Sequence, residues 1–204
     1  MRAGSQFFAF IGAIVRSDAG AVAQELARNA SLATMTYGGE TGRRTAPSIF
    51  YDQVGHYMYG GDTPLHLAAA ACCPPVAELL VANGADVRAK NRRGAEPLHY
   101  AADGNRCEPS RQAGTIRRLI AAGADPDAVD RSGVTPLHRA VRTRSVAAVR
   151  ALIDGGASVN KKNRSGSTPL FLARHNTGRG GSGTPRALEA RAAIEAILIE
   201  RGAR

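Results

Sequence analysis

One short motif occurs four times in this chain at a nearly constant spacing. The copies read GDTPLHLAAA from Gly61, AEPLHYAAD from Ala95, VTPLHRAVR from Val134 and STPLFLARH from Ser167. Their prolines lie 33, 39 and 33 residues apart, so the basic period is 33 residues. A unit of this length cannot bury its apolar face alone, so the sequence predicts a row of similar units that cover one another.

Each copy of the motif is typical of the start of a helix. The threonine found in three of the copies can accept a backbone N–H of the first turn, and the proline after it tolerates the missing N–H there. The leucine that follows should enter the core, and the alanines should let neighbouring helices approach closely. A glycine downstream in each unit can end the second helix in a left-handed conformation, at Gly84, Gly123, Gly156 and Gly202.

The pattern T-P-L-H-x-A on a 33-residue period resembles the ankyrin repeat. The resemblance covers residues 61–203 directly. It implies an all-α solenoid of about five helix-turn-helix units with short β-turn fingers, in a single domain over residues 1–204. It also implies a binding scaffold rather than an enzyme.

The spacing of the motifs predicts the extent of each unit. Two units carry additional residues, 6 in one and 13 in the other. We expect a degenerate N-terminal repeat over 7–31, a loop and hairpin insert over 32–60, and repeats over 61–91, 92–130, 131–163 and 164–204. The last repeat contains a glycine-rich insert, and its final helix should run from Thr184 to about Arg201.

Two segments outside the motif allow alternatives. The apolar run FFAFIGAIV after Arg2 fits a short secretory signal, but Arg16 and Asp18 follow it at once, which favours a first helix. In the insert, the first half should form a flexible loop because of its Gly, Thr and Pro content. The second half, with Phe50, Tyr51, Tyr57 and Tyr59, could form a short hairpin.

Composition limits the compartment and the kinds of partner. The net charge is +10, with 24 Arg against 3 Lys, which favours an anionic partner unless codon usage alone produced the arginines. The three cysteines show no framework spacing, so we expect reduced thiols in a cytoplasmic protein. The sequence offers no apolar run long enough for a membrane span.

No residue pattern indicates catalysis, a metal or a cofactor. The resemblance gives His66, His99 and His138 a structural role near the helix starts, and it gives the Asp residues of DPDAVD a role in tying the turn between units. The GRGGSG segment, residues 178–183, matches a phosphate-binding glycine pattern, but no strand precedes it. We therefore interpret it as an inserted loop, with an anion site as the alternative.

The resemblance places partner contacts at the turn tips and on the exposed side of the first helices. Five arginines among these positions should line one concave face, where the planar guanidinium suits carboxylates. The sequence predicts a monomer that binds an acidic protein segment, with nucleic acid as the alternative ligand and a merely solvated arginine rim as the competing interpretation. The predicted contact residues are Tyr59, Asp62, Arg92, Arg93, Asp103, Arg131, Val134, Arg142, Arg164 and His175.

Overall fold

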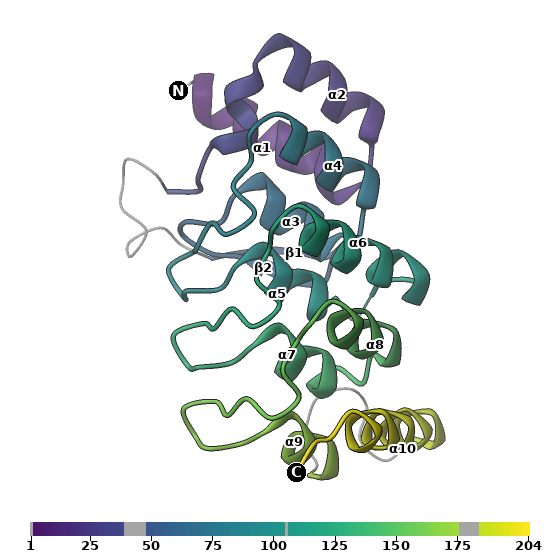
Figure 1. Ribbon diagram of the computed structural model, residues 1–204. Helices are drawn as coiled ribbons and strands as arrows, with labels where there is room; N and C mark the ends of the chain where they lie inside the picture. The colour runs from purple at the N-terminus through teal and green to yellow at the C-terminus, as the bar shows by residue number, and fades with distance from the viewer. Residues whose placement is uncertain (1, 39–47, 105, 176–183) are drawn as a thin grey trace.

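The computed structural model describes residues 2–38, 48–104, 106–175 and 184–204. These residues form helix pairs that stack in one row, with the two chain ends at opposite ends of the row (Figure 1). The fold is the all-α solenoid that the repeat period predicts. The pairs are α1 (Arg2–Val15) with α2 (Ala19–Arg28), α3 (Pro64–Ala70) with α4 (Pro74–Ala82), α5 (Pro97–Ala102) with α6 (Pro109–Ala121), α7 (Pro136–Arg142) with α8 (Val146–Asp154), and α9 (Pro169–Arg174) with α10 (Pro185–Glu200).

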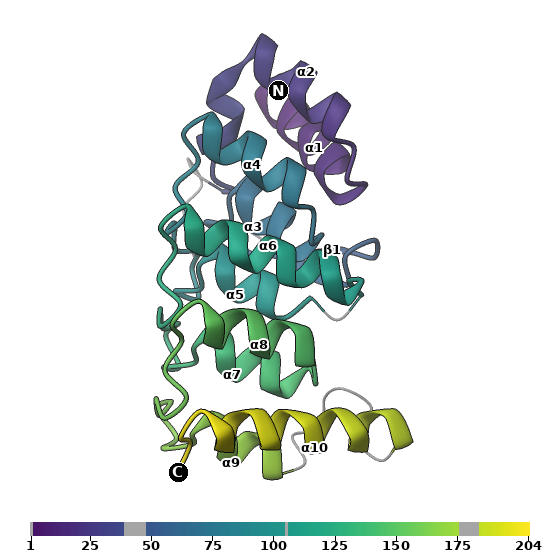
Figure 2. The same cartoon turned by 45° about the vertical axis from the view of Figure 1, so that its right-hand side comes forward.

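The first helices of the pairs form an inner row, and the second helices form an outer row. Figure 2 shows α4, α6, α8 and α10 one below another, each beside its shorter partner. Helix α3 packs on α5, α5 on α7 and α7 on α9, while α4 packs on α6 and α6 on α8. The segments 83–96, 122–135 and 155–168 connect successive pairs and project to one side (Figure 1); we call them fingers.

The repeated threonine and histidine act locally as their positions predict. Thr135 Oγ1 accepts the backbone N–H of His138 at 3.3 Å, which caps α7. The backbone N–H of Thr135 in turn donates to His138 Nδ1 at 3.2 Å. The other ring nitrogen, Nε2, therefore carries the proton, and it donates to the carbonyl of Ser167 in the next finger at 3.0 Å.

The same histidine contact recurs between the other units. His66 Nε2 reaches the Ala95 carbonyl at 3.1 Å, and His99 Nε2 reaches the Val134 carbonyl at 3.0 Å. Burial lowers the pKa of both histidines, that of His99 to about 3, so the rings are neutral donors. The structural role predicted for these residues is confirmed.

One continuous hydrophobic core runs through the stack. The motif leucines at 65, 98 and 137 are fully buried, and the leucine at 170 is 4% exposed. The motif alanines are fully buried as well, because their small side chains let adjacent inner helices approach closely. Each unit thus supplies one apolar layer to its neighbours, as the repeat pattern requires.

The N-terminal apolar run belongs to this core. Phe10, Ile11 and Ile14 of α1 are at most 1% exposed, and α1 packs on α3. The first pair therefore begins before residue 7, where the sequence placed its start. A 3₁₀ helix, Ala30–Thr34, follows α2.

The insert between the first two pairs contains the expected hairpin. Strands β1 (Ile49–Tyr51) and β2 (His56–Met58) pair antiparallel, with Phe50 opposite Tyr57. The loop predicted for the first half of the insert falls largely on residues 39–47, and the glycine-rich insert falls on 178–183. Both segments lie outside the described residues.

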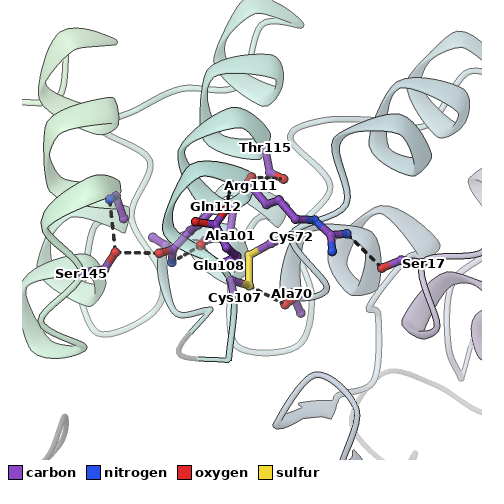
Figure 3. The surroundings of a disulfide bond; sticks show 12 residues. Ser17, Ala70, Cys72, Ala101, Cys107, Glu108, Arg111, Gln112, Thr115 and Ser145 are labelled. Carbon is purple, nitrogen blue, oxygen red and sulfur yellow. Dashed lines mark hydrogen bonds between the residues drawn. A yellow bond between two sulfur atoms is a disulfide. The ribbon is translucent and has the colours of Figure 1, made fainter.

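A disulfide joins Cys72, in the turn between α3 and α4, to Cys107, in the loop between α5 and α6 (Figure 3). The expectation of three reduced thiols is therefore wrong; Cys73 alone is a free thiol, and it is buried. The two bonded cysteines are 35 residues apart in sequence, but stacking brings equivalent ends of neighbouring units together, with a Cα–Cα distance of 5.9 Å. Only the stacking of these two units shows which two of the three cysteines pair.

Candidate partner-binding site

A cavity of about 600 Å³ opens where the hairpin, the fingers and the inner helices meet. The hairpin supplies one wall, two fingers supply another, and the C-terminal ends of α5 and α7 supply the remainder. The lining residues are Phe50, Gly55, His56, Tyr57, Tyr59, Asn91, Arg93, Ala95, Tyr100, Asp103, Asp130, Ser132, Val134, Arg139, Arg142 and Thr143.

The fingers contribute alternate residues to the cavity. Residues 91, 93 and 95 of one finger and residues 130, 132 and 134 of the next line it, and each tip is a β-turn closed by a hydrogen bond from Gly94 to Asn91 or from Gly133 to Asp130. Arg92 and Arg131 occupy the intervening positions and lie outside the lining. The arginines predicted to form one stripe therefore divide between two places.

Backbone hydrogen bonds hold successive finger tips in register. The N–H of Arg92 donates to the Gly60 carbonyl at 2.8 Å, that of Arg131 to the Arg93 carbonyl at 2.9 Å, and that of Arg164 to the Ser132 carbonyl at 3.0 Å. Arg92, Arg131 and Arg164 thus stand at equivalent positions on consecutive tips. We call these three the finger arginines, and they form a row beside the cavity.

An ion-pair network crosses the floor of the cavity. One guanidinium nitrogen of Arg139 lies 3.0 Å from Asp130 Oδ2, and another lies 3.6 Å from Asp103 Oδ2. Burial disfavours the Asp130 carboxylate, but hydrogen bonds from Arg139 and from the N–H groups of Ser132 and Val134 outweigh it, so the pKa of Asp130 is lowered. Asp130 is therefore ionised, and Arg139 engages both carboxylates.

Two contacts fix the hairpin against α5 and the loop after it. The His56 ring stacks on Tyr100 with centroids 4.2 Å apart, and its Nε2 lies 3.8 Å from Asp103 Oδ2. In the turn of the hairpin, the Asp52 carbonyl accepts a hydrogen bond from the Arg106 guanidinium. The hairpin therefore has a defined place over the inner helices.

A buried hydrogen-bond network lies beneath the hairpin. Asp62 accepts from the Tyr100 hydroxyl at 2.8 Å, from Asn91 Nδ2 at 2.8 Å and from the Tyr59 N–H at 2.6 Å. Burial, followed by the Asp62 charge, raises the pKa of Tyr100 well above its usual value, so the phenol remains a donor. Asp62 is fully buried, so its predicted contact with a partner is incompatible with this structure.

Aromatic side chains form the hairpin wall. Phe50 and Tyr57 are 43% and 46% exposed, and their ring centroids are 4.8 Å apart. Tyr59 continues the group, 6.0 Å from Tyr57. The guanidinium carbons of Arg92 and Arg93 lie 5.4 Å and 4.9 Å from the Tyr59 centroid, a cation–π arrangement that connects the aromatic wall to the fingers.

The structure gathers about half of the predicted contact residues. Tyr59, Arg93, Asp103, Val134 and Arg142 line the cavity. The finger arginines lie beside it. His175 lies at the C-terminal end of α9, where its ring stacks on Phe171 with centroids 3.9 Å apart, and it does not line the cavity.

Sequence reasoning missed several residues of the site. His56 was considered only as a metal ligand, and Phe50 and Tyr57 only as hairpin residues. Arg139 was missed because the motif treats the residue between the histidine and the alanine as variable. This variable position could have pointed to the site, because a residue that differs between copies can have a role of its own. The four copies have Leu67, Tyr100, Arg139 and Leu172 at this position. Within the described residues, no group of three or more His, Cys, Asp or Glu could hold a metal ion.

Comparison with protein families agrees with the architecture. A family model described as ankyrin repeats (3 copies) matches residues 107–180, and an ankyrin repeat model matches residues 60–92. Together these matches cover slightly more than half of the 204 residues. The motif, the stacked helix pairs and the two matches all lead to one conclusion: the chain belongs to the ankyrin-repeat family.

Proposed function

We propose that this protein is a non-enzymatic scaffold that recognises an acidic segment of a protein partner. Ankyrin repeats are generally protein–protein interaction modules. The observation that carries the finer proposal is the placement of Arg93 and Arg142 in one cavity beside the row of finger arginines. Guanidinium groups suit carboxylates because their planar donors can form two parallel hydrogen bonds.

The carboxylates in the same cavity do not cancel this charge. Asp103 and Asp130 are both engaged by Arg139, with side chains 19% and 11% exposed. Arg93 and Arg142 line the same cavity, so an acidic ligand in it would meet their guanidinium groups as well.

The nucleic-acid alternative has less support. It rests on the net charge of +10 and on the few tyrosines that could stack with bases. One of these, Tyr100, is 1% exposed beneath His56 and cannot receive a base. Binding through phosphate contacts alone would depend steeply on salt.

The proposal is tested with the purified full chain and three labelled probes: oligo-glutamate, oligo-lysine and a single-stranded DNA oligonucleotide. We expect oligo-glutamate to bind, as measured by fluorescence anisotropy, and the affinity to fall as salt rises. Binding of DNA with higher affinity than oligo-glutamate at the same salt concentration would replace the proposal with the alternative.

Charge-reversal variants locate the binding surface. Changing the three finger arginines to Glu, or changing Arg93 and Arg142 to Glu, should abolish oligo-glutamate binding and leave the far-UV circular dichroism unchanged. The matched control changes Arg117 and Arg150, which are exposed on the outer helices α6 and α8, to Glu. Equal affinities for the two test variants and the control would mean that the arginines are only a solvated rim.

The oligomeric state and the location remain predictions. We propose a monomer, which sedimentation would check. None of the helices among the described residues has the length and apolar character to cross a membrane. The proposed cytoplasmic location must be reconciled with the Cys72–Cys107 disulfide, because the cytosol keeps most such bonds reduced. Alkylation of thiols in intact cells would show whether Cys72 and Cys107 are oxidised or reduced there.

A further inference from the structure

We propose that the hairpin makes the cavity selective for acidic segments that carry an aromatic side chain. The aromatic ring of the partner lies against Phe50 and Tyr57, and adjacent carboxylates of the partner pair with Arg93 and Arg142. This inference rests on the proposed function, since it specifies the partner class for the same site.

The aromatic half of the site is an exposed pair on one face of the hairpin. Phe50 and Tyr57 are directly opposite each other in the register, so their side chains share a face. On the other face, Met58 is fully buried in the core, which anchors the hairpin. Two large rings, each more than two-fifths exposed, thus form a fixed apolar surface that borders the cavity.

The cationic half comes from other elements that line the same cavity. Arg93 comes from a finger and Arg142 from the last turn of α7. The guanidinium of Arg93 lies over Tyr59, which itself neighbours Tyr57, so the aromatic and cationic halves are contiguous. Arg139 belongs to the floor of the cavity, because its charge is engaged by Asp103 and Asp130.

The volume of the cavity and its mixed lining favour a partner segment in which carboxylates flank one aromatic side chain. They favour it over a long segment that carries only carboxylates. Cavities of roughly 300–1,000 Å³ enclose ligands of small-molecule size, and this one measures about 600 Å³. A purely acidic segment would leave the apolar wall in water, and a purely aromatic segment would bring no carboxylate to Arg93 and Arg142. A segment with both groups satisfies both halves because it buries the ring and pairs the charges.

Peptide pairs that differ only in the ring test the inference. The labelled probes are EEEFEEE, EEEAEEE and KKKFKKK, each titrated against the full chain by fluorescence anisotropy. We expect EEEFEEE to bind about tenfold more tightly than EEEAEEE, and KKKFKKK not to bind. Equal affinity for the first two would overturn the inference and leave the proposed function standing. Absence of binding by both acidic peptides would refute the proposed function itself.

Substitutions of the exposed hairpin rings test whether the hairpin causes the preference for the peptide with the aromatic residue. Tyr57→Ala and Phe50→Ala should each bring the affinity ratio of EEEFEEE to EEEAEEE close to one, while EEEAEEE binds as it does to the unmodified protein. The control is Leu188→Ala, which truncates a comparably exposed apolar side chain on α10 and should keep the tenfold ratio. A ratio unchanged in both hairpin variants, with far-UV circular dichroism intact, would overturn the inference.

Discussion

Replacing Glu96 by threonine should stabilise this protein, because Glu96 occupies a position where the other three motif copies have threonine. The backbone at this helix cap is the same in all four copies, with φ near −100° and ψ near 165° at both Thr63 and Glu96. Threonine therefore fits without strain. Glu96 is 3% exposed, and within the described residues its Oε2 finds no hydrogen-bond partner.

The magnitude follows from the groups around the carboxylate. An unsatisfied buried oxygen costs about 1–3 kcal/mol. The remaining oxygen lies 3.6 Å from the Lys90 ammonium, but that lysine side chain is 56% exposed, so the pair contributes about 0–1 kcal/mol. Threonine would keep the capping box of α5 that the Glu96 side chain already forms, as Thr135 forms it in α7. We expect Glu96→Thr to raise the free energy of unfolding by about 1 kcal/mol at pH 7.

The pH dependence distinguishes this cause from a general improvement in packing. Burial raises the pKa of Glu96, and Lys90 only partly opposes it. The folded protein therefore binds the proton more tightly than the unfolded chain, so the penalty is complete above the folded pKa and disappears below the ordinary value of 4.5. The gain from Glu96→Thr should shrink as the pH falls from 7 to 4.

Urea denaturation followed by far-UV circular dichroism at the two pH values measures the effect. The reverse change, Thr135→Glu, is the matched control and should destabilise the protein at pH 7. A loss of stability in Glu96→Thr at pH 7, or an equal gain at both pH values, would refute the reasoning.

Three further predictions concern the stability of the stack. Leu137→Asp places a charge at a fully buried position and should cost more than about 4 kcal/mol, which loss of far-UV circular dichroism would reveal. Cys107→Ser opens a loop with a separation of 35 residues and should cost about 3–4 kcal/mol in urea denaturation, and unlike Cys73→Ala it should not respond to added reductant. The pKa of His99 falls from 6.5 to about 3 on folding, so protonation of the unfolded chain should lower the free energy of unfolding by about 2 kcal/mol between pH 7 and pH 5. His99→Gln should reduce this dependence of stability on pH. An unchanged dependence in the variant would contradict the role given to His99.

The outcome for the arginines shows how far a repeat pattern can predict a surface. Equivalent positions in the motif do become a row, since the three finger arginines stand on consecutive tips. The pattern could not show which side of the finger each residue faces. Arg93 lines the cavity and Arg92 does not, although both are in the same β-turn at the finger tip.

Most of the structural features that the sequence did not predict are contacts made by insertions into the repeat pattern. The hairpin was expected from its aromatic residues, but its position over α5 depends on contacts from His56 to Tyr100 and from Arg106 to Asp52. These contacts join residues more than 40 positions apart. The same hairpin helps to cover Tyr100, whose hydroxyl binds the fully buried Asp62.

The sequence by itself determined the solenoid, the helix caps and the structural histidines, since each of these depends on residues within one unit or on a regular contact with the next. Only the tertiary structure decided the cavity, the Arg139 network, the burial of Asp62 and the Cys72–Cys107 bond. The physical reason is that periodic contacts repeat with the motif and can be read from its spacing. Contacts made by insertions and by variable positions occur once, and their geometry exists only after the units have stacked.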